Sequence, residues 1–285
     1  MTVDGAGAPG GDGPVLYPTG SDHRRVAGRA ARRVTQVPAL ARRAVQHPGW
    51  ILEAVRMASR RRRSSAMAFD PRDHPGLLAD EAEALAAVTG IPIERCAEAL
   101  AATRSPLADE TLGGHPLYGA RTTLLRLVGA VVGLTEPAVV VETGVAQGLT
   151  SAAILEALEA NGRGRLHSID LPVLGADDGE FVGRLVPARL RHRWTLHRGP
   201  SAQLLAPLLA DLGHIDVFLH DAEHTYDAQL AELRTVWPRL RPGAVVLVDD
   251  VNNPAFVDFA RSVDGAARLV VDGAGRDAVG VLGRP

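Results

Sequence analysis

AVVVETGVAQGLTSAAILEALEA, residues 138–160, is the stretch that decides the fold. Its first residues form a short apolar run rich in valine that ends in Glu142, a pattern typical of a buried strand. A turn with two glycines follows, and then apolar residues at helical spacing. This order of strand, glycine turn and helix predicts the first βα unit of a sheet of parallel strands.

The alternation of apolar runs and helical stretches continues from there toward the C-terminus. Helices are expected between the first five strands, for example over Ser151–Ala160, Ser201–Leu212 and Tyr226–Leu240. Alternation at this spacing predicts a doubly wound, Rossmann-like α/β fold, which binds its ligands at the carboxyl ends of the strands. The expected strands are Val139–Glu142, Leu166–Asp170, Trp194–His197, Ile215–Leu219, Ala244–Val248, Ala267–Val271 and Val279–Leu282.

The glycine turn after the first strand has the composition of a nucleotide-binding loop. Gly144 permits a tight turn and the close approach of a ligand, and Gly148 lets the next helix pack near the strand. The E-x-G-x-x-x-G spacing is neither the dinucleotide-binding fingerprint nor a phosphate-binding loop. A turn with a purely structural role is the alternative.

Asp170 ends the second expected strand, 22 residues beyond Gly148. An acid at that position in a Rossmann-like sheet accepts hydrogen bonds from the ribose hydroxyls of an adenosine. The alternative is a surface acid that caps the following loop. After the third strand, Ser201 is expected to be the N-cap of the next helix.

Three carboxylates follow the fourth and fifth strands: Asp221, Asp249 and Asp250. Adjacent acids repel one another unless a proton or a cation lies among them. Oxygen ligands of this kind suit Mg²⁺, which would lower the pKa of a bound hydroxyl, so a magnesium site at these three residues is one hypothesis. In the alternative, Asp249 stabilises the loop and only one acid acts directly.

Two histidines near these acids are candidate bases. His224, with Asp221 beside it, is expected to be catalytic, because a neutral imidazole can accept a hydroxyl proton near pH 7. His220 is its rival, and a histidine that only hydrogen-bonds the backbone at a strand end is a further alternative. Asn253 is expected to complete metal or substrate contacts.

The N-terminal part differs in composition from the rest of the 285-residue chain. Residues 1–20 are rich in Gly, Pro and Asp, which predicts a disordered tail. A basic amphipathic helical arm over 21–65 and a helical cap over 66–135 are expected to precede the α/β domain at 136–285. Such an arm can contact membrane or nucleic acid, but a solvated face on a dimerisation or lid helix is commoner. The scarcity of aromatic residues disfavours nucleic acid further.

The cysteine count and the hydropathy of the chain bear on where in the cell the protein is found. A single cysteine, Cys96, excludes an internal disulfide and a cysteine-based zinc site, and its Ala/Leu-rich surroundings predict a packing role. No window has the roughly 20 continuous apolar residues of a membrane span, and the N-terminus lacks the order of a signal peptide. We therefore expect a soluble cytoplasmic protein. The net charge of −2 says little about partners, because the basic residues, all arginine, are unevenly distributed.

Three stretches together resemble the class I S-adenosylmethionine-dependent methyltransferases of the group often labelled methyltransferase family 24. They are VVETGVAQGLTSAAILEALEANGRGRLHSIDLP at 140–172, IDVFLHDAEHTYDAQLAELRTVWPRLRPGAVVLVDDV at 215–251 and NPAFVDFA at 253–260. The resemblance covers roughly residues 112–283 and does not extend to residues 1–65.

The resemblance implies a seven-stranded methyltransferase sheet and S-adenosylmethionine as the methyl donor. Carried over to this chain, the donor-binding residues are Glu142, Gly144, Gly148 and Asp170. In related enzymes an acid often lies near the adenine after the third strand, where this chain has Pro200, so no adenine ligand is assigned there.

Similar bacterial enzymes O-methylate sugars or phenols in antibiotic pathways, so the resemblance also implies O-methylation of a small molecule in a secondary-metabolite pathway. Those enzymes use Mg²⁺ held by acids after the fourth and fifth strands, which here are Asp221, Asp249 and Asp250. Many relatives read I-D-G-x-H-x-Y where this chain reads HDAEHTY, at 220–226, so alanine replaces a loop glycine.

Two other classes of function compete with a methyltransferase. An NAD-dependent oxidoreductase would need the G-x-G-x-x-G loop and usually a Tyr/Lys or His catalytic pair, and the chain has no lysine. A non-catalytic binding or regulatory protein could keep the fold without the chemistry. The intact glycine turn at Glu142–Gly148 and the acids after the fourth and fifth strands favour a methyltransferase over a non-catalytic protein.

Overall fold

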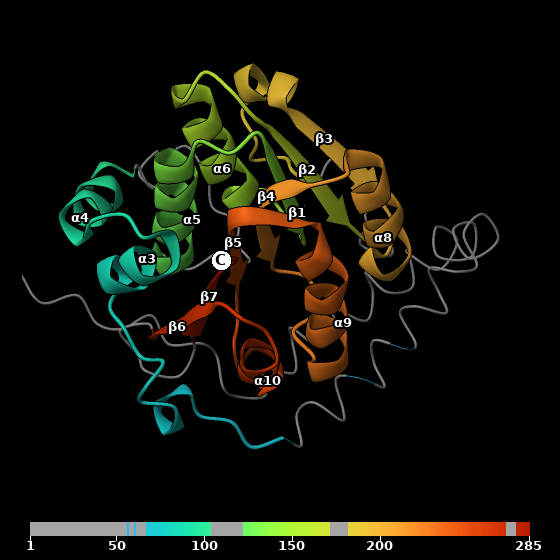
Figure 1. Cartoon of the computed structure of the whole chain (residues 1–285). Coiled ribbons are helices and arrows are strands. Elements are labelled where there is room, and N and C mark those ends of the chain that lie inside the picture. The colour runs from blue at the N-terminus through green and yellow to red at the C-terminus, as the bar shows by residue number, and fades with distance from the viewer. Residues whose placement is uncertain (1–55, 57–59, 61–66, 104–121, 172–181, 272–277) are drawn as a thin grey trace, which may run out of the picture.

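The computed structural model describes residues 56, 60, 67–103, 122–171, 182–271 and 278–285 (Figure 1). The tail expected over 1–20 lies outside the described residues. So does the arm expected over 21–65, apart from Arg56 and Arg60.

The centre of the fold is a seven-stranded sheet with the order β3-β2-β1-β4-β5-β7-β6. The first five strands are parallel, as the alternating pattern predicts, and β7 runs antiparallel between β5 and β6. All seven expected strands are therefore confirmed. Their bounds are Val139–Thr143 for β1, Arg165–Asp170 for β2, Trp194–Arg198 for β3, Ile215–His220 for β4, Leu240–Val248 for β5, Ala266–Val271 for β6 and Ala278–Gly283 for β7.

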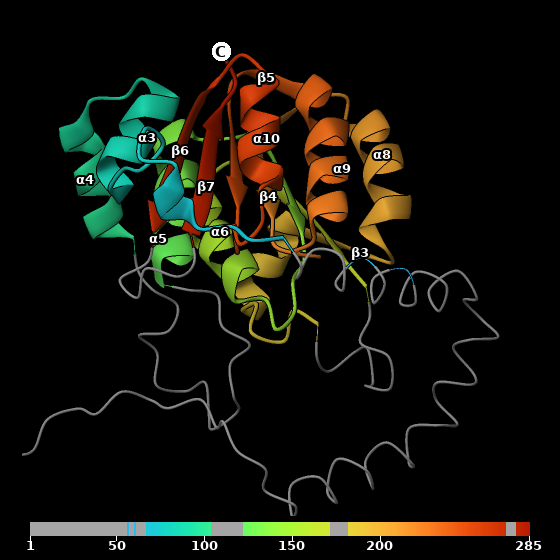
Figure 2. The ribbon, with the colours of Figure 1, turned by 90° about the horizontal axis from the view of Figure 1, so that it is seen from below.

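Helices cover both faces of the sheet, which makes three layers (Figures 1 and 2). One core joins the sheet to α3 (Glu81–Thr89), α4 (Ile93–Ala102), α5 (Thr122–Thr135) and α6 (Leu149–Ala160). The other core lies under α8 (Ser201–Leu212), α9 (Tyr226–Val236) and α10 (Ala255–Arg261). Short 3₁₀ turns complete the described elements: η1 (Pro71–Asp73), η3 (Ala188–Arg193) and η4 (Trp237–Arg239). Cys96 is fully buried, which confirms its packing role.

The strand period of two decides which core each side chain enters. Along β4, Val217 and Leu219 point into the α5/α6 core, and Phe218 points into the α8/α9 core. His220 therefore points toward α9, on the side of Phe218. This alternation matters for the site, because polar residues at the strand ends are sent to opposite faces of the sheet.

The structure differs from the expected helices in two places. The helix expected over Tyr226–Leu240 ends at Val236, because Pro238 cannot continue the hydrogen-bond ladder and η4 begins there. Ser201 is the first residue of α8 and its N-cap is Pro200, so the expected capping role of Ser201 is wrong.

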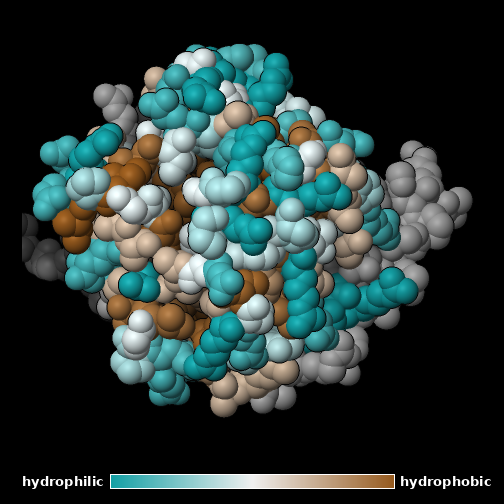
Figure 3. All heavy atoms as spheres, in the orientation of Figure 1, coloured by the Kyte–Doolittle hydropathy of each residue, from teal (hydrophilic) through white to brown (hydrophobic). Residues whose placement is uncertain are grey.

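The N-terminal segment covers the edge of the sheet at β6. The N–H of Leu269 donates to the carbonyl oxygen of Leu77 at 2.7 Å, and the N–H of Ala79 donates to the carbonyl oxygen of Leu269 at 3.1 Å. A backbone that pairs in this way protects an edge strand from pairing with another chain. Over the face shown in Figure 3, polar and apolar side chains are interspersed, with apolar ones gathered mainly on the side of α3 and α4.

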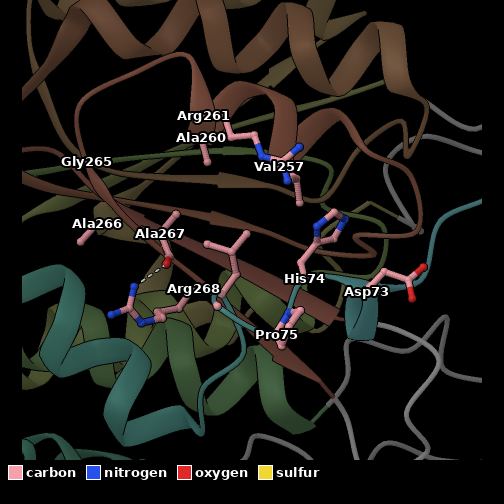
Figure 4. A pocket seen from close by; sticks show the side chains of 12 residues that line it. Asp73, His74, Pro75, Val257, Ala260, Arg261, Gly265, Ala266, Ala267 and Arg268 are labelled. Atoms are coloured by element: carbon pink, nitrogen blue, oxygen red, sulfur yellow. Dashed lines mark hydrogen bonds between the residues drawn. The ribbon is translucent and has the colours of Figure 1, made fainter.

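A cavity of about 540 Å³ lies beside this covered edge, between residues 73–77, the end of α10 and the start of β6 (Figure 4). His74, Arg261 and Arg268 line it, and Arg268 donates to the carbonyl oxygen of Ala267 at 2.7 Å. The cavity is at the amino end of β6. It is therefore remote from the carboxyl ends of the parallel strands, where ligands of this fold bind.

Candidate functional site

The candidate site lies where β1 and β4 are neighbours, because the strand order reverses direction there. The N–H of Asp221 donates to the carbonyl oxygen of Thr143 at 2.8 Å, so the loops after the two strands start side by side. Gly144 has a φ of +87°, and a Cβ on it would overlap the carbonyl of Asp221. The close approach that was expected for a ligand at Gly144 is thus made by the chain itself.

Gly148 has a comparable constraint at the start of α6. Its φ is +89°, and a Cβ there would press on the Cα of Gly183. The N–H of Gly183 donates to the carbonyl oxygen of Ala146 at 2.9 Å. The N–H of Leu185 donates to the carbonyl oxygen of Gln147 at 2.9 Å. Gly148 therefore makes room for the segment that begins at residue 182, whereas the sequence predicted close packing of helix on strand.

Asp170 holds the glycine loop in place. Its Oδ2 accepts from the N–H of Val145 at 2.9 Å and from the N–H of Ala146 at 2.7 Å. Burial raises the pKa of Asp170, although these two hydrogen bonds act in the opposite direction. Ala146 has a φ of +47°, which is costly for a residue with a side chain, and the carboxylate helps to hold it there. The ribose-binding role of Asp170 stays a prediction.

Glu142 is fully buried on the α6 side of the sheet. Its Oε2 accepts from the hydroxyls of Ser151 and Ser168, both at 2.6 Å, and the indole of Trp194 donates to Ser168 at 2.9 Å. Burial raises the pKa of Glu142 to about 7, against the effect of the two serines. Its Oε1 has no hydrogen-bond partner among the described residues, so this oxygen can accept a hydrogen bond from a ligand.

A second buried carboxylate occupies the opposite face. Oε2 of Glu232 lies 2.8 Å from Nδ1 of His220 and accepts from the hydroxyl of Thr143 at 2.6 Å. Burial opposes the ionisation of Glu232, but the charge of His220 and the hydrogen bonds around it lower the pKa overall. His220 is therefore engaged with α9, and the sequence missed this partner because Glu232 lies in the middle of a helix that reads as an ordinary amphipathic one.

His224 lies between two of the predicted acids. Its Nε2 is 3.8 Å from Oδ1 of Asp221 and 3.7 Å from Oδ2 of Asp250. Burial and the neighbouring charges of Asp249, Glu142 and Asp250 raise the pKa of Asp221 well above its ordinary range. The imidazole thus lies beside Asp221 and Asp250, and the catalytic role of His224 and Asp221 stays a prediction.

The magnesium site predicted at Asp221, Asp249 and Asp250 stays a prediction. In the part of the chain that the structure describes, no three His, Cys, Asp or Glu side chains are arranged to hold a metal ion. The imidazole of His224 lies near two of the predicted ligands, Asp221 and Asp250. Asp249 is buried, and its N–H donates to the carbonyl oxygen of His220 at 2.9 Å.

Asn253 is not placed to complete such a site. Its Oδ1 accepts from the N–H of Ala255, the first residue of α10, at 3.0 Å. The sequence also missed Glu223, which lies between Asp221 and His224 in the chain and is buried. Its partner is Arg60, more than a hundred residues earlier.

Residues 141–251 match a family model described as a methyltransferase domain. These residues form a methyltransferase domain. The match runs from β1 to the end of β5, so it includes both loops of the candidate site, and it confirms the resemblance drawn from the sequence. No curated protein matches the chain. None of the helices within the described residues is long and apolar enough to cross a membrane.

Several solved structures are similar to this chain. A putative O-methyltransferase from Klebsiella pneumoniae is 20% identical over 67% of this chain and 89% of its own, with a TM-score of 0.48. An O-methyltransferase from Bacillus cereus in complex with SAH is 16% identical over 71% and 96%, with a TM-score of 0.48. The O-methyltransferase TomG from Streptomyces achromogenes, in complex with SAM, is 23% identical over 66% and 90%, with a TM-score of 0.47.

Replacing Glu142 by Gln is expected to remove a pH dependence of stability. The folded-state pKa of about 7 lies above the ordinary 4.5. The protonated form therefore contributes stability that is complete below about pH 4.5 and is lost as the pH rises through about 7. The full loss is about 3 kcal/mol. Urea unfolding at several pH values measures it, with the half-exposed Glu156→Gln as the control; an unchanged slope in Glu142→Gln would refute the assignment.

Replacing Gly144 by Ala is expected to destabilise the fold more than replacing Gly162. Both glycines have positive φ, +87° and +67°, but a Cβ at Gly162 meets nothing within 4 Å. The backbone conformation alone costs about 1–2 kcal/mol in each variant. The overlap with Asp221 adds about 1–3 kcal/mol at Gly144. Equal losses in urea unfolding would mean that the two loops are not in close contact.

Proposed function

We propose that this domain transfers the methyl group of S-adenosylmethionine to a hydroxyl of a small molecule, with His224 as the general base. The observation that carries the proposal is the position of His224 at the carboxyl edge of the sheet, where its Nε2 lies 3.8 Å from Asp221 and 3.7 Å from Asp250. A secondary metabolite is the proposed acceptor, since the bacterial enzymes that the sequence resembles act on such compounds.

The charge of the site supports a cationic donor. Asp221 follows β4, and Asp249 and Asp250 follow the neighbouring strand β5. Burial and the carboxyl groups of Asp249, Glu142, Asp250 and Asp170 raise the pKa of Asp221. Carboxylates in a site of low dielectric favour a positive ligand and disfavour a negative one. S-adenosylmethionine carries a sulfonium, whereas NAD carries an anionic pyrophosphate. The acids therefore support the methyl donor over the dinucleotide.

The groups available for holding this donor fit its polar parts. Glu142 offers a buried Oε1 without a hydrogen-bond partner among the described residues, and Asp170 lies at the end of the neighbouring strand β2. An acid at the end of β2 suits the ribose hydroxyls of an adenosine. Gly144 and Gly148 contribute indirectly, because they let the loop between them adopt its turns.

Methyl transfer is an in-line displacement in which positioning supplies much of the rate. The acceptor oxygen forms a bond to the methyl carbon while the carbon–sulfur bond breaks, and the donor leaves as a neutral thioether. The hydroxyl proton passes to the imidazole of His224. Asp221 and Asp250 stabilise the imidazolium that results, because they lie on either side of Nε2. No step in this proposal uses a metal.

The donor is tested by calorimetric titration with S-adenosylmethionine and S-adenosylhomocysteine, both of which should bind and raise the melting temperature. Asp170→Ala should weaken binding by about 1–3 kcal/mol, which is about 5- to 150-fold. Asp216→Ala is a matched control, because Asp216 also accepts two backbone N–H groups, from Ala138 and Val139, but at the opposite edge of the sheet. Binding of NAD in place of both ligands would overturn the donor assignment.

The base is tested by turnover with S-adenosylmethionine and a metabolite extract of the source, followed by mass spectrometry for a product heavier by one CH₂. His224→Gln should lower turnover by about 100- to 10,000-fold and leave donor affinity unchanged. His192→Gln, on an exposed histidine, should have no effect. Turnover should survive exhaustive chelation. Loss of turnover on chelation with recovery on adding Mg²⁺ would contradict the metal-free mechanism, and donor binding without any product would favour a binding protein.

A further inference from the structure

An arginine from outside the matched domain reaches the loop that carries His224. Nε of Arg60 donates to Oε1 of Glu223 at 2.8 Å, and Nη2 of Arg60 donates to Oε2 at 2.5 Å. Both carboxylate oxygens are thus held by one guanidinium. Such paired, charge-assisted hydrogen bonds fix the orientation of the two groups as well as their distance.

The pair is largely shielded from water. The side chain of Arg60 is 18% exposed and that of Glu223 is 8% exposed. Surface ion pairs contribute little to stability, but breaking a buried pair by removing one partner leaves an uncompensated charge and is strongly unfavourable. Arg60 and Glu223 therefore stabilise each other's positions strongly.

Glu223 is also tied to its own loop. Thr225 donates from its hydroxyl to Oε1 of Glu223 at 3.0 Å and from its N–H to the carbonyl oxygen of Glu223 at 2.7 Å. Glu223 therefore connects Arg60 to the loop that carries His224: its carboxylate binds Arg60, and its backbone carbonyl accepts from the N–H of Thr225 in that loop. The loop supplies a hydroxyl to this carboxylate, and Arg60 supplies a cation.

We propose that Arg60 is a positioning residue for methyl transfer, which fixes residues 221–225 so that His224 stays between Asp221 and Asp250. The expected effect of Arg60 on turnover rests on the proposed function. The pair itself does not depend on that function. It gives the basic arm predicted over 21–65 a role in the site: one of its arginines orders the catalytic loop.

The chain offers a matched control for this pair. Arg72 binds Asp70 through two nitrogens in the same way, with Nε 2.9 Å from Oδ1 and Nη2 2.6 Å from Oδ2. These side chains are 65% and 36% exposed; Asp70 is the N-cap of η1, and Arg72 lies within it. Arg72→Gln thus removes an arginine of the same geometry near the N-terminal part without touching the loop of His224.

The experiment uses the full chain with ¹⁵N-labelled histidine. The ring signals of His224, identified with the His224→Gln variant, are compared in Arg60→Gln, Glu223→Gln, the double variant and Arg72→Gln. Both single variants should shift the His224 signals, and the double variant should shift them no further, because the two residues act as one unit. Amide exchange over residues 221–226 should rise by about tenfold or more in the same variants. Arg72→Gln should change neither.

The affinity for S-adenosylhomocysteine separates this proposal from the proposed function. It should stay within about twofold in every Arg60 variant, since a difference that small is well below 1 kcal/mol. Failure of the wild-type chain to bind S-adenosylhomocysteine would refute the donor, but the effect on His224 and on amide exchange would still be measurable.

Arg60→Lys keeps the test decisive if Arg60→Gln does not fold. Lysine retains the charge but cannot bind both oxygens in a fixed plane, so the His224 signals should still shift. Unchanged His224 signals and unchanged exchange over residues 221–226 in the folded Arg60 variants would overturn the proposal.

Discussion

The close contact between Gly144 and Asp221 is the constraint on which the rest of the site depends. The loops after β1 and β4 start from neighbouring parallel strands and turn at the same edge of the sheet. They share that edge because Gly144 has no Cβ and because the N–H of Asp221 pairs with the carbonyl oxygen of Thr143. A methylene or methyl group between them would move Asp221, and with it the loop that carries His224.

Two buried glutamates, one on each face of the sheet, lie at this edge and have pKa values shifted in opposite directions. Glu142 has only serine hydroxyls for partners and a pKa raised to about 7, whereas Glu232 lies against His220 and has a lowered pKa. The difference follows from their surroundings, since a hydroxyl stabilises a buried charge less than an imidazole that can carry a proton. The two carboxyl groups at this edge therefore differ in how readily they ionise.

The negative groups above this edge suit a positively charged ligand, and the imidazole of His224 lies among them. The loop that carries His224 follows β4, which ends at His220, and Arg60 binds the same loop through Glu223. The methyltransferase domain supplies the acids and the base. Arg60, which lies outside the matched stretch 141–251, supplies the cation that binds Glu223 in the loop of His224.

The sequence by itself determined the seven strands, the order of strand and helix, and the residues that follow the strand ends. Apolar runs and glycine turns are local signals, so their pattern alone is enough to place Glu142, Asp170, Asp221 and His224 at the carboxyl edge. Only the tertiary structure decided what these residues contact. Ser168 and Trp194 meet Glu142 across strands, Glu232 meets His220 from a helix, and Arg60 meets Glu223 from 163 residues away. Such pairs depend on how the chain brings distant segments together, because neither partner alone differs from an ordinary polar residue of its helix, strand or loop.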